Sequence, residues 1–348
     1  NCRIRTVAES GGPASNPAQA PQRSEPGTKL TRSASERRNL YSRTVRIVSL
    51  IASATETVDA LGLSRFLVGR SHECDYPPWV RSLPACTKPR FRTSGDSRSI
   101  DEGVKNSLRE AGSVYEVLED ALASLRPDVI LTQSQCRVCA ASVEDVERAV
   151  SAKFDTHPRV VALEPNCLAD IFRDIGRIAD ACGVPDRRDR LAGEMKRRMD
   201  EVAARAKHQP ERPRVACIEW QEPLMAAGNW VPELVEMAGG RNLFGAAGAH
   251  SPWISWDDLV DADPDVLLVM PCGYGLERTR SEMYWLDRRQ QWGSLRAVRN
   301  GSTYIADGNL YFHRPGPRIV DSLLALAEVL HPRAFPPSLK GKAWLPYE

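Results

Sequence analysis

The stretch "LEDALASLRPDVILTQSQC", residues 118–136, has a counterpart in "WDDLVDADPDVLLVMPCG", residues 256–273. Each reads as a short helix, a Pro-Asp pair and then an apolar run that predicts a buried strand. When the two Pro-Asp pairs are superimposed, Asp120 falls on Asp257. The chain therefore contains an internal repeat.

The elements before these stretches recur in the same order. "RIVSLIA" (46–52) and "RVACIEW" (214–220) each predict a first strand, and "TETVDALGL" (55–63) and "PELVEMAGG" (232–240) each predict the helix that follows it. Strands that alternate with helices are typical of parallel sheets. The sequence thus predicts an α/β protein with two lobes of mostly parallel sheet and flanking helices.

Residues 167–207 carry no strand signal, and their apolar positions three and four apart predict helices. About 40 helical residues, at about 1.5 Å each, are long enough to join two lobes. The first 43 residues are rich in Ser, Pro, Gly, Ala and Arg and should be disordered. The predicted organisation is a disordered segment at 1–43, an N-terminal lobe at 44–166, a helical backbone at 167–210, a C-terminal lobe at 211–335 and a tail at 336–348.

Composition excludes several classes of partner. The 47 Lys and Arg against 45 Asp and Glu leave a net charge of +2, which gives no case for nucleic acid. No run of 18 apolar residues predicts a membrane span, and no secretory signal is visible. Nine cysteines, an odd number, favour reduced thiols and an intracellular location. Because the chain begins with Asn, a removed leader and a periplasmic location stay open.

The decapeptide "RSHECDYPPW", residues 70–79, follows a predicted strand directly. Ligands of open α/β sheets bind at the carboxyl ends of the strands. His72 and Cys74 are spaced like metal ligands, but a single pair of this kind also occurs unliganded in loops. We interpret the segment as the lip of a binding cleft.

Aromatic residues gather in or near other loops that follow strands, which suits a large, flat ligand. They are Trp220, Trp230, Trp253, Tyr274, Tyr311 and Phe312. Trp230 precedes the start of a helix in "AGNWVPE" and is the strongest single candidate. The loop "ADGNLYFHRPGPR" holds His313 and Arg314, whose imidazole could bind a metal and whose guanidinium could bind a carboxylate or propionamide.

Four cysteines are also predicted at this edge of the two sheets: Cys74, Cys136, Cys139 and Cys272. Their thiolates, with His72, could form a zinc site or supply a soft ligand to a corrinoid metal. Equally, they could be small, partly buried side chains without a ligand. The sequence leaves both interpretations open.

Taken in order, five motifs carry a resemblance to a known superfamily: "RIVSLIASATETVDALGL", "SHECDYPPW", "LRPDVILTQ", "AGNWVPELVEMAGGRNLF" and "RPGPRIVDSLLALAEVLHP". Over about residues 44–335 the chain resembles the helical-backbone metal receptors, whose fold is that of class III periplasmic binding proteins. Within them it is most similar to the cobalamin-binding proteins of ABC importers. The resemblance implies two lobes bridged by a rigid helix, a corrinoid or metal chelate in the cleft, and no catalysis.

The resemblance assigns roles to particular residues. "CDYPP" matches the family's DYPP loop, which places Asp75 and Tyr76 at the ligand. One acidic residue on each lobe of such proteins docks on the permease, and these positions fall on Asp120 and Asp257, where Glu is usual. We predict ligand contacts from His72, Glu73, Asp75, Tyr76, Trp220, Trp230, Trp253, Tyr311, His313 and Arg314.

The predicted function is therefore non-catalytic binding of cobalamin or a related corrinoid, by a monomer that delivers it to an ABC transporter permease. One alternative is a metal-ion or siderophore binder with a Cys/His site, with zinc among the metals considered. The other is a thiol enzyme in which Cys136 or Cys139 works with His72 or His313 as base. No GxSxG, HExxH, P-loop or GxGxxG motif supports catalysis.

Overall fold

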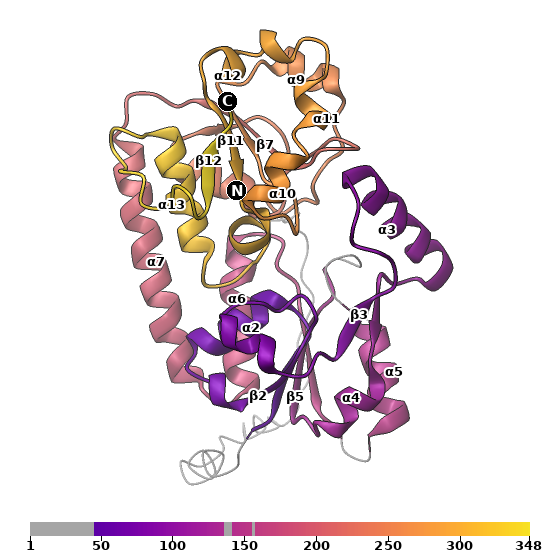
Figure 1. Cartoon of the computed structure of the whole chain (residues 1–348). Helices are drawn as coiled ribbons and strands as arrows, with labels where there is room; N and C mark the ends of the chain where they lie inside the picture. The colour runs from indigo at the N-terminus through magenta and orange to yellow at the C-terminus, as the bar shows by residue number, and fades with distance from the viewer. Residues whose placement is uncertain (1–44, 136–140, 155–156) are drawn as a thin grey trace, which may run out of the picture.

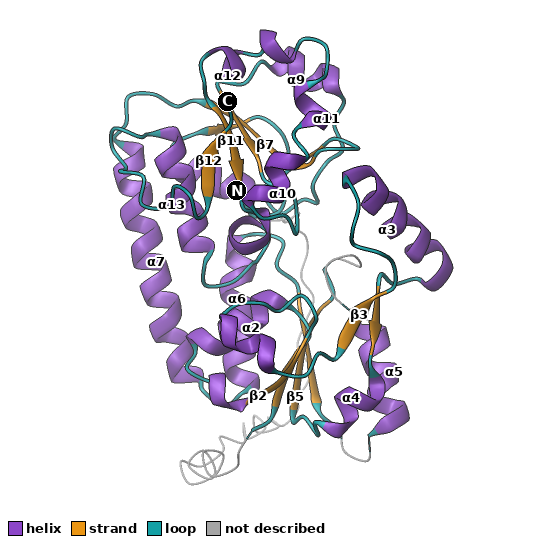
Figure 2. Cartoon of the chain, viewed as in Figure 1, coloured by secondary structure: helices purple, strands orange, loops and turns teal. Residues whose placement is uncertain are grey.

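A computed structural model describes residues 45–135, 141–154 and 157–348. The strands of this part form two main sheets, one in each half of the chain, and helices flank both (Figures 1 and 2). The predicted fold class, two α/β lobes bridged by helix, is confirmed. The segment predicted to be disordered, together with Cys136 and Cys139, lies outside the described residues.

The N-terminal lobe has a sheet of four parallel strands in the order β2-β1-β5-β6. Its elements are β1 (Ile47–Ser49), α2 (Ala52–Ala60), η1 (Ser64–Phe66), β2 (Leu67–Arg70), η2 (Pro78–Ser82), β3 (Thr87–Pro89), α3 (Ser97–Ala111), β4 (Tyr115–Val117), α4 (Glu119–Ser124), β5 (Val129–Gln133), α5 (Val143–Lys153) and β6 (Arg159–Leu163). Residues of β5 alternate between two apolar clusters, since Val129 and Leu131 pack on one face and Ile130 on the other. Both faces of the sheet are therefore buried, as the apolar run predicts.

An insertion between β3 and β4 was not predicted. The two strands pair antiparallel, apart from the main sheet, and α3 connects them. Asp96 caps the first turn of α3 by accepting a hydrogen bond from the Ser99 amide. The helix ends at Gly112, which has a φ of 68°, a left-handed conformation that glycine adopts without strain.

Two helices, α6 (Leu168–Ala181) and α7 (Pro185–Lys207), form the bridge between the lobes. The first half of α6 packs in the apolar core of the C-terminal lobe through Ile171 and Ile175, and its second half packs in the N-terminal lobe through Ile178. The 23 residues of α7 extend about 34 Å along one side of the molecule (Figure 1). The predicted helical backbone is thus an antiparallel pair rather than a single helix.

The C-terminal lobe contains a six-stranded sheet in the order β12-β11-β10-β7-β8, with β9 also paired to β7. Its elements are β7 (Arg214–Trp220), β8 (Met225–Ala226), α8 (Val231–Met237), β9 (Arg241–Asn242), α9 (Trp256–Ala262), β10 (Val266–Val269), α10 (Leu276–Ser281), α11 (Tyr284–Asp287), η3 (Trp292–Ser294), α12 (Arg296–Arg299), β11 (Thr303–Ala306), the π-helix η4 (Gly308–Phe312), α13 (Ile319–Leu330) and β12 (Trp344–Pro346). The parallel strands β7, β10 and β11 form its centre.

The segment predicted as a tail, residues 336–348, belongs to this sheet. Its strand β12 pairs antiparallel with β11. The buried carboxylate of Glu328 holds the segment, because it accepts hydrogen bonds from the Ser338 amide at 2.9 Å and the Trp344 indole at 2.8 Å. A buried carboxylate needs such donors to remain in an apolar core.

The repeat extends to hydrogen bonds where each sheet begins. The Asp128 carboxylate accepts the backbone N–H of Arg46 at 2.8 Å, and the Asp265 carboxylate accepts the backbone N–H of Arg214 at 2.8 Å. Each arginine guanidinium in turn donates to a carbonyl at the end of the helix that precedes the aspartate, α4 or α9. The predicted internal repeat is confirmed at this level of detail.

None of the helices within the described residues combines the length and the apolar character that a membrane crossing requires.

Candidate ligand-binding cleft

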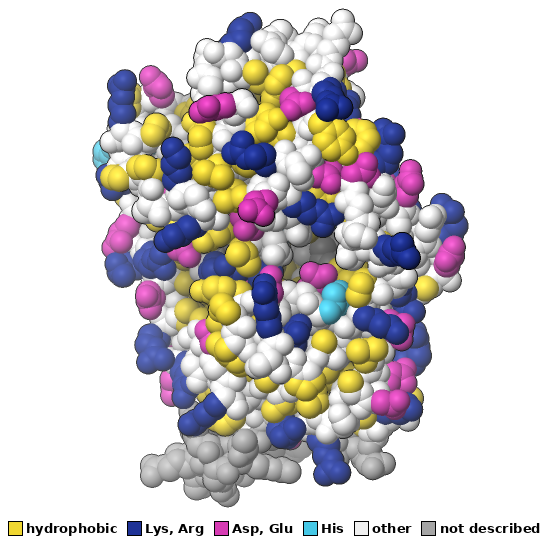
Figure 3. All heavy atoms as spheres, viewed as in Figure 1, with side chains coloured by type: hydrophobic (Ala, Val, Ile, Leu, Met, Phe, Trp, Pro, Cys, Tyr) yellow, Lys and Arg dark blue, Asp and Glu magenta, His cyan; other side chains and the backbone are white. Residues whose placement is uncertain are grey.

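The loops that follow parallel strands of each lobe meet the other lobe. The loop after β2 contacts the C-terminal lobe through Asp75, and the loop after β5 does so through Gln135, whose amide donates to Asn229 at 2.9 Å. Between the lobes the surface is hollowed at mid-height, beside α3 (Figure 3). This is the place where the topology of the two sheets predicts a ligand.

A buried charge cluster joins the lobes here. Glu56 on α2 is almost fully buried, and its carboxylate accepts hydrogen bonds from Arg314 at 3.0 Å and from Arg318 at 2.8 and 2.5 Å. Arg314 also lies 2.7 Å from Asp75. We call Glu56, Asp75, Arg314 and Arg318 the interlobe clamp. Buried charges persist only when they are paired in this way.

The clamp changes the expected roles of two predicted ligand contacts. Burial would raise the pKa of Asp75, but its hydrogen bond and ion pair with Arg314 outweigh burial and hold the pKa below its usual value. The Arg314 guanidinium is buried and already bound by two carboxylates. Both side chains therefore hold the lobes together. Arg314 is buried, whereas the sequence suggests a guanidinium at the cleft edge that binds a ligand.

The sequence does not single out Glu56 and Arg318. One signal for Glu56 was present: a carboxylate within the apolar and small residues of "IASATETV" needs a basic partner if that helix is buried. The partner lies far away in the sequence, on the segment that leads into α13. Arg318 also stacks on Tyr76, with its guanidinium carbon 4.0 Å from the ring centre, and lies 5.5 Å from the ring of Tyr311.

His72 and Glu73 lie at the lip of the N-terminal lobe, as predicted. The His72 Nδ1 is 2.8 Å from the Thr87 hydroxyl, and its Nε2 is 3.1 Å from the Glu73 carboxylate. The ring also meets the edge of Tyr115 at a centroid distance of 4.9 Å. The imidazole is thereby held in one orientation, with a fifth of its side chain exposed.

His313 is not the protruding imidazole that the sequence predicts. Its Nε2 lies 2.7 Å from the Met270 carbonyl, and its Nδ1 lies 3.8 Å from the Glu219 carboxylate. Burial works to lower its pKa, but Glu219 and the Met270 carbonyl stabilise the imidazolium and raise the pKa overall. The ring is thereby held in the interior of the C-terminal lobe and does not protrude into the cleft.

Cys74 lies in the apolar core of the N-terminal lobe. Its side chain is fully buried, and it accepts a hydrogen bond from the Thr55 hydroxyl at 3.0 Å. Burial raises the pKa of the thiol to about 11, which disfavours the thiolate that zinc requires. Cys272 lies in the loop just after β10 and is partly buried. Within the described ranges, no three His, Cys, Asp or Glu side chains are arranged to hold a metal ion.

The three predicted tryptophans have different surroundings. Trp230 packs in the main apolar core of the C-terminal lobe, and its indole donates to the Phe312 carbonyl at 3.0 Å. At 5% exposed, it supports η4 and offers no surface to a ligand. Trp220 is covered by α3, whose Ser97 carbonyl accepts its indole N–H at 3.2 Å. Trp253 is 55% exposed and is the freest of the three.

Asp120 and Asp257 lie in the first turns of α4 and α9, one on each lobe. The Asp120 side chain is 91% exposed and 3.0 Å from the Lys153 ammonium. It lines a shallow charged depression with Arg90, Glu116, Asp145 and Arg148. Asp257 is also exposed. Both carboxylates are thus accessible to a docking partner.

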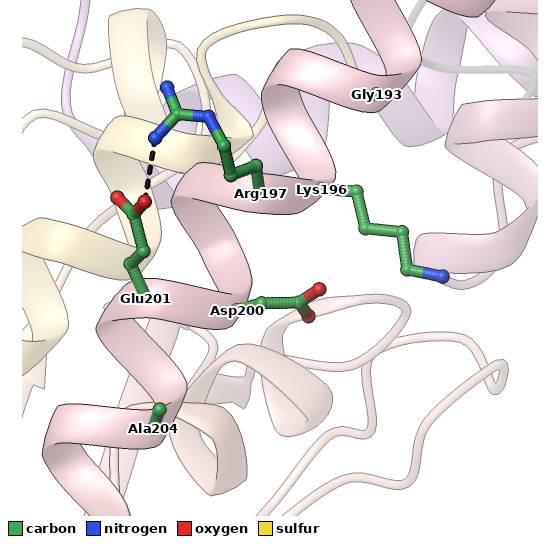
Figure 4. A pocket seen from close by; sticks show the side chains of 6 residues that line it. All are labelled: Gly193, Lys196, Arg197, Asp200, Glu201 and Ala204. Carbon is green, nitrogen blue, oxygen red and sulfur yellow. Dashed lines mark hydrogen bonds and ion pairs between the residues drawn. The ribbon is translucent and has the colours of Figure 1, made fainter.

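A second surface hollow lies on the outer side of α7 and is separate from the cleft. A single helix supplies all of its lining residues, and Arg197 and Glu201 pair across one turn at 2.6 Å (Figure 4). A ligand site needs groups that converge from several elements. This hollow is therefore part of the charged outer surface of the backbone helix.

Comparison with known proteins defines the class. The model of the periplasmic binding protein family matches residues 47–310, and the chain belongs to this family of non-catalytic solute-binding proteins. An uncharacterised ABC transporter substrate-binding lipoprotein of Bacillus subtilis is 23% identical over 297 residues, which are 83% of this chain and 81% of that protein. A vitamin B12-binding protein of Photorhabdus laumondii is 22% identical, over 84% of this chain and 90% of that protein.

Solved structures agree on the fold. The apo form of a periplasmic heme-binding protein from Roseiflexus sp. RS-1 superimposes with a TM-score of 0.62 at 24% identity, covering 83% of this chain and 99% of that protein. The names of these relatives do not support the intracellular location inferred from the nine cysteines. Membership of a binding-protein family also argues against the thiol-enzyme alternative, and the chain is not an enzyme.

Proposed function

We propose that this protein holds a corrinoid in the cleft between its lobes, outside the cytoplasm, and delivers it unchanged to the permease of an ABC importer. The observation that carries the proposal is the fixed cleft between the lobes. The interlobe clamp and the helices α6 and α7 hold the carboxyl ends of the two sheets facing each other around one hollow. The vitamin B12-binding relatives favour a corrinoid as the occupant.

Within the cleft, we expect His72, Glu73 and Tyr76 to contact the ligand from the N-terminal lobe. From the C-terminal lobe, Trp253 replaces Trp230 as the aromatic candidate because it is exposed. Tyr311 lies beside Arg318 at the edge of the clamp and is a weaker candidate. Broad contact with a few orienting polar groups is how proteins hold large rings.

Ligand titration tests the proposal. Cyanocobalamin, hemin and a ferric siderophore are each added to the purified protein, and binding is followed by absorbance and tryptophan fluorescence. We expect saturable 1:1 binding of cyanocobalamin, with the ligand recovered intact by mass spectrometry. Saturable binding of hemin alone would replace the corrinoid with heme, the ligand named for a solved relative.

Delivery depends on docking. We propose that Asp120 and Asp257 bind basic pockets of the permease, one through each lobe. Asp120→Lys and Asp257→Lys should abolish uptake by cells that express the permease without weakening ligand binding in solution. Asp200→Lys, on the outer side of α7, is the matched control. Normal uptake by both docking variants would remove these carboxylates from the interface.

A further inference from the structure

The helix α3 belongs to the N-terminal lobe in sequence, but its first turn is bound to the C-terminal lobe. The Glu282 carboxylate accepts the backbone N–H of Ser97 at 2.9 Å and its hydroxyl at 2.5 Å. Both residues are buried. The first amides of a helix have no partner within it, so a carboxylate there is favourable. Here the other lobe supplies that carboxylate.

The backbone at and just before the start of α3 is also bound by side chains of the C-terminal lobe. Trp220 donates its indole N–H to the Ser97 carbonyl at 3.2 Å, and Arg278 donates to the carbonyls of Gly95 and Thr93 at 2.9 and 3.3 Å. These contacts use main-chain atoms of the N-terminal lobe and side chains of the C-terminal lobe. They also cover Trp220 at the carboxyl end of β7, where a ligand would otherwise reach it.

Charged and aromatic contacts surround this point. Arg98 pairs with Glu222 at 3.0 Å and lies over the ring of Trp285 at 4.5 Å. Farther along the helix, the Lys105 ammonium lies 5.8 Å from the ring of Trp253. The seam is polar and open to water at its margin, because the Arg98 side chain is 55% exposed.

This seam differs from the other links between the lobes. Of the residues of α3, only Ser97 and Ser107 are buried, so the helix itself contributes little apolar surface to the seam. Water can replace each hydrogen bond when the helix leaves, which makes the net loss small. The interlobe clamp, by contrast, has the buried ion pair of Glu56 and Arg314 at its centre, and α6 packs in the apolar cores of both lobes. Gly95 and Gly112, with φ of 144° and 68°, stand at the two ends of α3 and can absorb a change of direction.

We propose that α3 is a releasable strap that closes the cleft on the side opposite α7 (Figure 1). It detaches from Glu282, Trp220 and Arg278 as a unit, and the interlobe clamp stays closed meanwhile. Its release uncovers Trp220 and admits or frees the ligand. This gating role rests on the proposed function, whereas the release itself does not.

Hydrogen exchange of the ligand-free protein tests the release. In Glu282→Ala, amides of residues 93–105 should exchange about tenfold faster than in the parent, and amides of α2 and α13 should be unchanged. Glu282→Gln, which keeps an acceptor, should be intermediate, and Arg278→Ala should reproduce the effect independently. Glu277→Gln, on the exposed face of α10, is the control. Unchanged exchange at 93–105 in Glu282→Ala and Arg278→Ala, or equal acceleration at α2 and α13, would overturn the strap.

Rate measurements with cyanocobalamin test the gate. Association and dissociation rates should both rise about tenfold in Glu282→Ala, with the Kd changed less than about threefold, because the strap would control passage rather than affinity. Faster exchange with unchanged rates would show that the ligand enters elsewhere and would overturn the gating role. Should neither cyanocobalamin nor hemin bind the parent, the proposed function and the gating role fail together, and the exchange experiment alone decides whether α3 releases.

Discussion

At the start of each sheet the two lobes are built alike, and at the cleft they are not. Asp128 and Asp265 bind the amides of Arg46 and Arg214 with the same geometry. Toward the cleft, the N-terminal lobe adds α3, and the C-terminal lobe adds η4 and α13. The shared hydrogen bonds maintain the fold of each lobe. Each contact of the clamp, by contrast, has one partner in the segment between η4 and α13, and each contact of the strap has one in α3 or in the residues just before it. Differences between the repeats therefore locate the contacts that join the lobes.

A substitution in the interlobe clamp should lower the free energy of unfolding the most, because the clamp has no counterpart within either lobe. Glu56→Ala leaves Arg314 and Arg318 buried without that carboxylate and should lower the free energy of unfolding by about 3–5 kcal/mol. Urea denaturation measures this change, with the exposed Glu277→Ala as control. A loss below about 1 kcal/mol would mean that the clamp is not needed to join the lobes.

Removing either of the hydrogen bonds that the two lobes share should lower the free energy of unfolding by an intermediate amount. Asp128→Ala and Asp265→Ala each remove the acceptor of a backbone N–H that water can reach at least in part, and each should cost about 0.5–1.5 kcal/mol of unfolding free energy. Asp265→Ala should be the more severe, since Asp265 also pairs with Arg296 at 2.8 Å. Urea denaturation of both variants under one set of conditions compares them directly. A larger cost for Asp128→Ala than for Asp265→Ala would contradict this ranking.

Local patterns were enough to predict the repeat, the parallel strands and the helical backbone. They predicted a helix start at Trp230, which is the N-cap of α8, but not the direction of its side chain, which turns inward to the Phe312 carbonyl. The same limit applies to Arg314 and His313, whose partners lie far away in the sequence. Glu56 and α3 were missed because their roles depend on contacts with the other lobe.

Substitutions of two histidines in the C-terminal lobe should change the stability least. The contributions of these histidines to stability should depend on pH in opposite directions. Burial lowers the pKa of His331, so protonation favours the unfolded chain and stability falls as pH drops below about 6.5, the ordinary histidine value. The pKa of His313 is raised against the effect of burial, chiefly by Glu219. Its stabilising contribution is present below about pH 6.5 and is lost as pH rises through the raised folded-state value.

Melting temperatures between pH 5 and 8 separate these contributions. His331→Gln should reduce the loss of stability on the acidic side, because no proton is then taken up on unfolding at that position. His313→Gln should lower the Tm more at pH 5 than at pH 8, because only the imidazolium pairs with Glu219. His208, exposed on the last turn of the backbone helix, gives the control His208→Gln. Equal losses of Tm at both pH values for His313→Gln would show that the His313 ring is neutral in the folded protein and forms no ion pair with Glu219.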